Sequence, residues 1–114
     1  MAKLSRIAPE MPATDLASAL EYYEQRMGFR VAMRMPDYAI VERDGVAIHL
    51  FEDRARKHSP VGIHIFTADL DELFEELRAS GALITQAIEK KPWGNREFRV
   101  KDDFGNEIKF TEPA

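Results

Sequence analysis

The fold is decided by a segment that occurs twice in the chain, first as Ile7-Ala8-Pro9-Glu10-Met11-Pro12-Ala13-Thr14-Asp15-Leu16 and again as Val61-Gly62-Ile63-His64-Ile65-Phe66-Thr67-Ala68-Asp69-Leu70. In each copy a short, largely apolar stretch leads to an aspartate and a leucine, after which a helical pattern begins. Asp15 and Asp69 are 54 residues apart, which is close to half of the 114 residues in the chain. A repeat at this spacing predicts two copies of one supersecondary module.

Each copy continues into an amphipathic helix. Thr14 or Asp15 can cap the first amide groups of the first helix, and Gly28 stands where a left-handed C-terminal cap belongs. In the second copy Asp69 or Asp71 takes the capping place. The apolar residues at helical spacing, which are expected to be core, are Leu16, Ala19, Leu20, Tyr23 and Met27 in the first helix and Leu70, Leu73, Phe74 and Leu77 in the second.

Short alternating segments follow each helix and predict strands. They cover residues 30–35, 38–43 and 46–51 in the first half and 83–87, 96–101 and 107–111 in the second. The dipeptides Asp44-Gly45 and Gly105-Asn106 are typical of hairpin turns. Each half therefore predicts a strand, a helix and three antiparallel strands, which makes the fold α+β. Residues 1–53 form the first module and residues 61–114 the second, and the polar linker 54–60 is expected to be flexible.

The composition restricts the class of protein. A chain of 114 residues with 45% hydrophobic content fits one compact domain. The formal charge of −4 gives no reason to expect nucleic acid as a partner, and no apolar run approaches the roughly 20 residues of a membrane span. There are no cysteines, and Met1-Ala2-Lys3-Leu4 lacks the apolar core of a signal peptide, so a cytoplasmic location is expected.

The one tryptophan lies in the segment Lys91-Pro92-Trp93-Gly94-Asn95-Arg96-Glu97-Phe98. Proline, glycine and asparagine favour an exposed turn over a buried core position. Trp93 is therefore either a packed plug or a stacking platform for a flat ligand, and its neighbours favour the platform.

Over nearly its whole length the chain resembles the bleomycin resistance proteins of the glyoxalase/bleomycin resistance/dioxygenase (vicinal oxygen chelate) superfamily. The residues that carry the resemblance are Thr14-Asp15-Leu16, Arg26-Met27-Gly28-Phe29, Asp37-Tyr38-Ala39, Pro92-Trp93-Gly94 and Arg96-Glu97-Phe98. The resemblance implies two βαβββ modules whose eight strands form a half-barrel cleft. In enzymes of the superfamily the cleft holds a divalent metal, whereas resistance proteins, typically as homodimers, only bind the drug.

The same resemblance locates the strand positions that supply metal ligands, and these fall on Ala8, His49, Ile63 and Lys109. Of these four side chains only the imidazole of His49 can donate to a divalent cation. No metal and no other cofactor is therefore expected. The alternative is a metal-dependent lyase, isomerase or dioxygenase in which His49, Glu107 and either Glu97 or Glu10 hold the cation.

Strand alternation predicts which side chains enter the cleft. Four apolar residues, Phe98, Val100, Ile108 and Phe110, would lie under the helices. The residues that alternate with them, Glu97, Arg99, Glu107, Lys109 and Thr111, would then face the cleft. The same count places Ile63 on the cleft face and His64 on the helix face. An alternative is that the charged residues only pair with one another, as in a structural or regulatory dimer without a ligand.

The resemblance further implies that Tyr38 and Trp93, one from each subunit, sandwich the planar group of the drug. The function predicted on this basis is non-catalytic sequestration of a bleomycin-like or other planar small molecule at the interface of a homodimer, with no catalytic residue. The complete set of predicted ligand-binding residues is Tyr38, His49, Phe51, Ile63, Trp93, Glu97, Arg99, Glu107 and Lys109.

Overall fold

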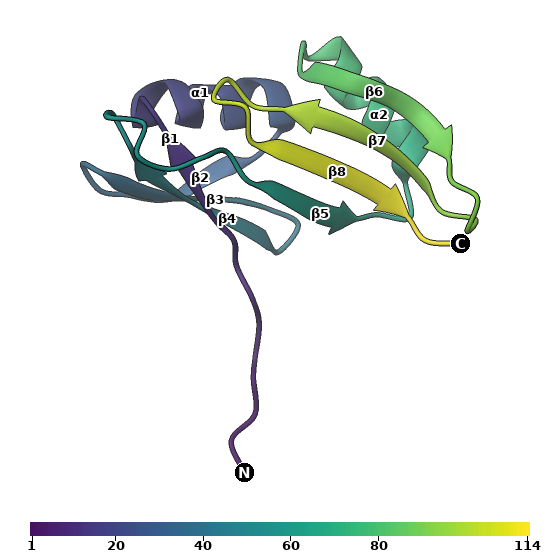
Figure 1. Cartoon of the computed structure of the whole chain (residues 1–114), viewed down its shortest axis with the longest axis horizontal. Helices are drawn as coiled ribbons and strands as arrows, with labels where there is room; N and C mark the ends of the chain where they lie inside the picture. The colour runs from purple at the N-terminus through teal and green to yellow at the C-terminus, as the bar shows by residue number, and fades with distance from the viewer.

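The computed structural model describes all 114 residues and contains two successive βαβββ modules, which lie side by side in Figure 1. The first module comprises β1 (Glu10–Ala13), α1 (Leu16–Met27), β2 (Arg30–Arg34), β3 (Tyr38–Arg43) and β4 (Val46–Glu52). The second comprises β5 (Gly62–Phe66), α2 (Leu70–Ala79), β6 (Leu83–Lys90), β7 (Arg96–Lys101) and β8 (Glu107–Glu112). The α+β fold predicted from the repeat is therefore confirmed.

Each module forms its own four-stranded mixed sheet. The strand order is β1-β4-β3-β2 in the first sheet, called sheet A below, and β5-β8-β7-β6 in the second, called sheet B. The first strand of each module pairs with the last in parallel, and the other neighbours are antiparallel. This topology follows from the order of elements, because a helical crossover brings the chain back to start a strand in the same direction.

Local signals in the sequence set the ends of the first helix. The Asp15 carboxylate accepts a hydrogen bond from the Ser18 amide at 3.2 Å, and Gly28 ends α1 with a φ of +73°. The positive φ favours glycine here, and a Cβ would also lie 2.7 Å from the end of the Arg43 side chain, which would have to move. Asp69 occupies the corresponding place before α2, but its side chain makes no capping hydrogen bond.

The core lies between each sheet and its helix. The buried residues of the predicted helical stripes are Leu16, Ala19, Leu20, Tyr23, Met27, Leu70 and Leu77, and Leu73 and Phe74 are partly buried against them. Phe98 and Phe110 stack with ring centroids 5.1 Å apart, and Phe74 packs edge-on against Phe98 at 5.2 Å. The prediction that these apolar residues form the core is confirmed.

Polar bonds join the two modules. The Tyr23 hydroxyl donates to the Asp102 carboxylate at 2.8 Å, and the Asn106 side-chain amide donates to the Pro12 carbonyl at 2.8 Å. The Arg43 guanidinium donates two hydrogen bonds to the Glu76 carboxylate at 2.7 and 2.8 Å. A bidentate pair of this kind fixes orientation as well as distance, so α2 is held against the hairpin between β3 and β4.

The linker between the modules is organised by the residue that precedes it. The Asp53 carboxylate accepts hydrogen bonds from the backbone amides of Lys57 at 2.9 Å and His58 at 2.8 Å. Arg56 adopts a φ of +51° inside the turn that these bonds close. The chain over residues 54–60 is therefore tied down at its start rather than free of contacts.

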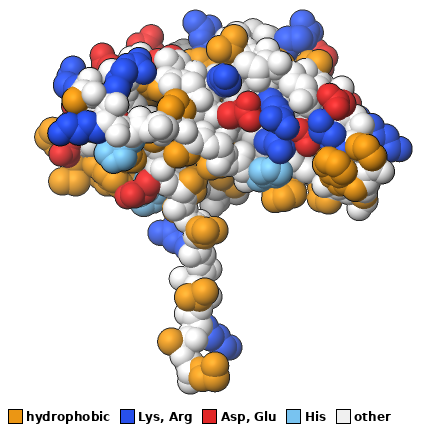
Figure 2. Space-filling view, viewed as in Figure 1, with side chains coloured by type: hydrophobic (Ala, Val, Ile, Leu, Met, Phe, Trp, Pro, Cys, Tyr) orange, Lys and Arg blue, Asp and Glu red, His pale blue; other side chains and the backbone are white.

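The first nine residues form neither helix nor strand; residues 1–7 are exposed and extend away from both modules in Figures 1 and 2, whereas the Pro9 carbonyl accepts a hydrogen bond from the His49 amide at 3.0 Å. Leu4 and Ile7 are fully exposed in this segment. The only helices, α1 with 12 residues and α2 with 10, are both too short for a hydrocarbon bilayer, and no candidate membrane-spanning helix is found.

Candidate functional site

Each sheet has one face covered by helix and core and a second face free of helix, called the open face below. Strand register assigns the side chains to these faces, because directly paired residues share a face. The open face of sheet A carries Glu10, Tyr38, Ile40, His49 and Phe51. The open face of sheet B carries His64, Glu97, Arg99, Glu107, Lys109 and Thr111.

Three polar residues meet on the open face of sheet A. The Tyr38 hydroxyl lies 2.7 Å from a Glu10 carboxylate oxygen and 2.7 Å from His49 Nδ1. Burial, together with the hydrogen bond to Glu10, raises the pKa of the Tyr38 hydroxyl above its ordinary value, so it keeps its proton at neutral pH.

The chemistry of the three side chains determines which of them donates each hydrogen bond. A carboxylate can only accept, so the single hydroxyl proton of Tyr38 is donated to Glu10. His49 Nδ1 must then carry a proton and donate it to the Tyr38 oxygen. His49 Nε2 is buried and has no hydrogen-bond partner, and in the tautomer with its proton on Nδ1 this nitrogen is an acceptor.

An arginine organises the charges on the open face of sheet B. Arg99 lies 3.2 Å from Glu97 and 3.1 Å from Glu107, so one guanidinium bridges two carboxylates. Glu97 is only 3% exposed, which makes its pairing with Arg99 necessary for burial of the charge. Lys109, directly opposite Arg99 in the sheet, makes no ion pair. The alternative in which all the charged residues of this face pair with one another is therefore met only in part, because Arg99 is paired and Lys109 is not.

The predicted orientation of β5 is wrong. Ile63 pairs with Ile108 and packs against the core, whereas His64 pairs with Lys109 and is exposed on the open face. The register of this parallel pair is set by long-range packing, and counting back from Asp69 missed it by one residue. The alternation of Ile63 and Ile65 with polar or exposed neighbours was the signal that favoured the observed orientation.

Trp93 lies in the turn between β6 and β7 and is 67% exposed, as its turn neighbours predict. The Gly94 amide donates to the Lys91 carbonyl at 2.9 Å, and the Lys91 amide donates to the Asn95 carbonyl at 2.7 Å. These bonds fix the backbone on both sides of the indole. Lys91 is also paired with Glu89 at 2.9 Å, which offsets one positive charge beside the ring.

Within one chain the two predicted stacking aromatics belong to different sheets. Tyr38 begins β3 of sheet A, and Trp93 lies in the β6–β7 turn of sheet B. Figure 1 shows β3 and this turn at opposite sides of the molecule. A single chain therefore does not bring Tyr38 and Trp93 together.

Two buried polar atoms in sheet B lack hydrogen-bond partners, namely Thr111 Oγ1 and Gln86 Nε2. Thr111 pairs with Glu97 across the sheet, and Gln86 pairs with Arg99 beside an irregularity in β6. Gln86 therefore shares the open face with Arg99, which the sequence did not predict, because an irregularity that shifts the alternation of a strand leaves no clear mark in the sequence.

The side chains do not fit a divalent metal. No three histidine, aspartate or glutamate side chains converge closely enough to hold one. At the positions implied by the resemblance, Ile63 faces the core, and the Lys109 ammonium cannot donate. His49 already uses Nδ1 in its bond with Tyr38, so a single imidazole nitrogen remains.

Comparison with known proteins agrees with the fold. The profile described as "Glyoxalase/Bleomycin resistance protein/Dioxygenase superfamily" matches residues 3–110, which include both modules. The chain belongs to this superfamily, and its resemblance to bleomycin resistance proteins is confirmed.

Individual relatives point the same way. The chain is 27% identical over 123 residues to the bleomycin resistance protein of Geobacillus stearothermophilus, covering 91% of this chain and 93% of that protein. It is similar in structure to TioX from Micromonospora sp. ML1, with a TM-score of 0.84 and 27% identity over 96% of this chain and 99% of TioX. A bleomycin-binding protein solved in complex with bleomycin shares the fold, with a TM-score of 0.83 and 20% identity over 97% of this chain and 100% of that one.

Proposed function

We propose that the protein is a non-catalytic binding protein that sequesters a planar organic molecule, of which a bleomycin-like drug is the leading candidate. The guest would lie between the open face of sheet A of one chain and the open face of sheet B of a second chain. The observation that carries the proposal is the exposed indole of Trp93 in the turn between β6 and β7, where hydrogen bonds hold the backbone on both sides of it.

Stacking supplies the affinity in this proposal. An offset aromatic pair contributes about 0.5–1.5 kcal/mol beyond the area it buries, and the indole offers a large flat face. Tyr38 supplies a second ring, and its bond to Glu10 leaves that ring in a fixed position. Because Tyr38 and Trp93 lie far apart in one chain, a sandwich between them requires a homodimer.

The polar residues of the two faces support binding rather than catalysis. Glu97 and Glu107 both pair with Arg99, so neither carboxylate is a free general base. Lys109 has no ion pair and remains available to a carbonyl or anionic group of the guest, and Phe51 adds apolar surface beside Tyr38. Ile63 faces the core and is not part of the proposed site.

The identity of the guest is supported by the family alone. The relative from Geobacillus stearothermophilus is a bleomycin resistance protein, and a bleomycin complex is known for a protein of the same fold. Sequestration requires only affinity and sufficient protein, so no reaction has to be assigned to the open faces.

A fluorescence titration tests the proposal. Metal-free bleomycin is expected to quench the single tryptophan saturably, with one drug bound per chain and chains pairing in sedimentation experiments. Calorimetry on Trp93→Ala is expected to show weaker binding. Leu83→Ala, which removes another exposed apolar side chain at the opposite end of β6, serves as the matched control. Equal affinity of Trp93→Ala and the unmodified protein would refute the stacking role.

A further inference from the structure

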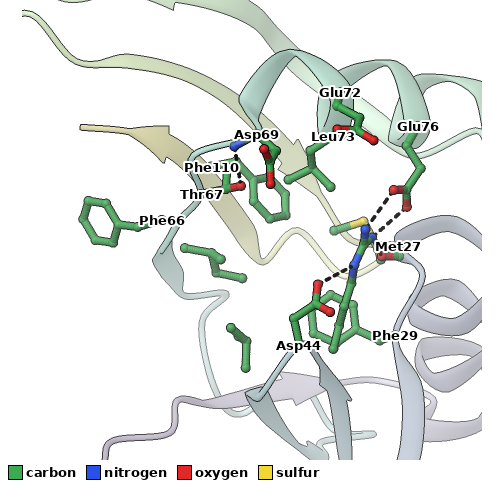
Figure 3. A pocket seen from close by; sticks show the side chains of 13 residues that line it. Met27, Phe29, Asp44, Phe66, Thr67, Asp69, Glu72, Leu73, Glu76 and Phe110 are labelled. Atoms are coloured by element: carbon green, nitrogen blue, oxygen red, sulfur yellow. Dashed lines mark hydrogen bonds and ion pairs between the residues drawn. The ribbon is translucent and has the colours of Figure 1, made fainter. Parts of the chain in front are cut away.

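A cavity of about 450 Å³ lies between the two modules, and of its lining residues only Phe66, which pairs with Thr111, also belongs to an open face. Its walls come from the end of α1, the β3–β4 hairpin, the end of β5 and the start of α2 (Figure 3). This volume falls within the roughly 300–1,000 Å³ typical of small-molecule pockets. The cavity is therefore large enough for a small organic molecule.

The floor of the cavity is apolar. Its seven hydrophobic residues are Met27, Phe29, Val46, Ile65, Phe66, Leu73 and Phe110. Phe66 is 61% exposed and lies at one side of the space in Figure 3, whereas Phe110 is buried at its base. An exposed aromatic beside a buried apolar surface offers a hydrophobic body a place to leave water.

The rim of the cavity is strongly acidic. It carries four carboxylates, on Asp44, Asp69, Glu72 and Glu76, against the single guanidinium of Arg43. Arg43 is already committed, because it binds Glu76 through two hydrogen bonds, Asp44 at 3.5 Å and the Met27 carbonyl at 2.9 Å.

The other two carboxylates are unpaired. The side chains of Asp69 and Glu72 accept no hydrogen bond and make no ion pair, and both residues lie at the start of α2. The start of a helix is a favourable place for acidic side chains. One cavity therefore combines an apolar floor, which suits a hydrophobic group, with free carboxylates, which suit a cationic group.

We propose that this cavity is a second ligand site, which takes an organic ammonium with an apolar or aromatic body. The ammonium lies between Asp69 and Glu72, and the body covers Leu73, Phe66 and Phe110. A neutral molecule of the same shape gains only the apolar contact, and an anion is repelled by the rim. Because both modules line the cavity, its occupant contacts the β3–β4 hairpin and α2 together.

Three probes that share one body and differ in the head group test this proposal. They are phenylbutylammonium, phenylbutanol and phenylbutanoate, titrated into isotope-labelled protein at neutral pH with amide chemical shifts as the readout. The ammonium is expected to bind most tightly and the carboxylate most weakly, with the shifts centred on Thr67 and Leu73. Equal affinity for the ammonium and the alcohol, or shifts centred on Trp93, would overturn the proposal.

Variants locate the charge that is recognised. Glu72→Gln is expected to weaken ammonium binding at least about threefold, the size of a partly exposed charge interaction. Glu75→Gln makes the same change on the same helix outside the cavity and is expected to leave the affinity unchanged. Phe66→Ala is expected to weaken the ammonium and the alcohol alike. Equal ammonium affinity in Glu72→Gln and Glu75→Gln would overturn the proposal, whatever the outcome of the bleomycin titration.

Discussion

The Tyr23 hydroxyl lies 2.8 Å from the Asp102 carboxylate, and this buried bond links α1 of the first module to the turn between β7 and β8 of the second. Asp102 also accepts from the Phe104 amide at 2.9 Å, the Asn106 amide at 3.0 Å and the Asn106 side chain at 2.8 Å. Burial raises the pKa of Asp102 above its ordinary value, although these hydrogen bonds act in the opposite direction. The carboxylate is thus an acceptor for four donors at the contact between the modules.

Asp102→Asn is expected to destabilise the fold by about 1–3 kcal/mol, because an amide nitrogen at the Oδ2 position would face the Asn106 side-chain donor. Tyr23→Phe removes a single donor and is expected to cost less, about 1 kcal/mol. Urea unfolding at neutral pH, followed by circular dichroism, measures both free energies of unfolding. A larger loss in Tyr23→Phe than in Asp102→Asn would contradict this account of the contact.

Arg99 and Lys109 lie side by side in sheet B but are expected to respond differently to loss of charge. Arg99→Met leaves Glu97 buried without its cation and is expected to cost about 2–3 kcal/mol of unfolding free energy. Lys109→Met breaks no ion pair and is expected to change stability by less than about 0.5 kcal/mol. Thermal or urea denaturation of the two variants provides the comparison, and similar losses would show that Arg99 does not neutralise Glu97.

The bonds of Tyr38 predict the tautomer of His49. In the unliganded protein the proton is expected on Nδ1, which long-range proton–nitrogen NMR correlations of the imidazole report directly. Glu10→Gln supplies an amide that can donate to Tyr38, so the hydroxyl can turn to His49 and the imidazole proton is expected to shift toward Nε2. Glu42→Gln, on the same sheet but outside this group, is the control. A protonated Nε2 in the unmodified protein would disprove the order of donors.

Asp53 is expected to contribute to stability in a pH-dependent way. Burial opposes its ionisation, but the amides of His58 and Lys57 outweigh this effect and lower the pKa of Asp53 below its ordinary value of 3.8. A lowered folded-state pKa stabilises the fold above that value, and the stabilisation is lost as the pH falls through the folded-state pKa. The difference in unfolding free energy between the protein and Asp53→Asn should therefore shrink below pH 3.8, and a constant difference would contradict the assignment.

Much of the fold can be predicted from short-range sequence signals. The Asp15 cap, the Gly28 stop and the Asp44-Gly45 turn, in which both residues have positive φ values of 51° and 79°, each depend on a few neighbouring residues. Because the module is repeated, a strand or helix predicted in one half supports the prediction of its counterpart in the other half. These features identify the modules before any long-range contact is considered.

The candidate site is less accessible to sequence reasoning because it depends on register and on packing between modules. The orientation of Ile63 follows from a parallel pairing with β8, which is distant in the sequence. The position of Gln86 follows from an irregularity in β6, and the acidic cavity is lined by residues of both modules, which the Arg43–Glu76 pair joins. Neither the irregularity in β6 nor the pairing of Arg43 with Glu76 leaves a periodic pattern in the sequence.

Because β3 and the β6–β7 turn lie at opposite sides of one chain, the proposed binding would depend on the concentration of the protein. A guest that stacks on both Tyr38 and Trp93 recruits two copies of the protein, so its retention depends on how many copies meet as well as on how much guest is present. Diluting the protein would release such a guest more steeply than simple one-to-one dissociation predicts. Protection by sequestration would then rise sharply once expression passed the level at which chains associate.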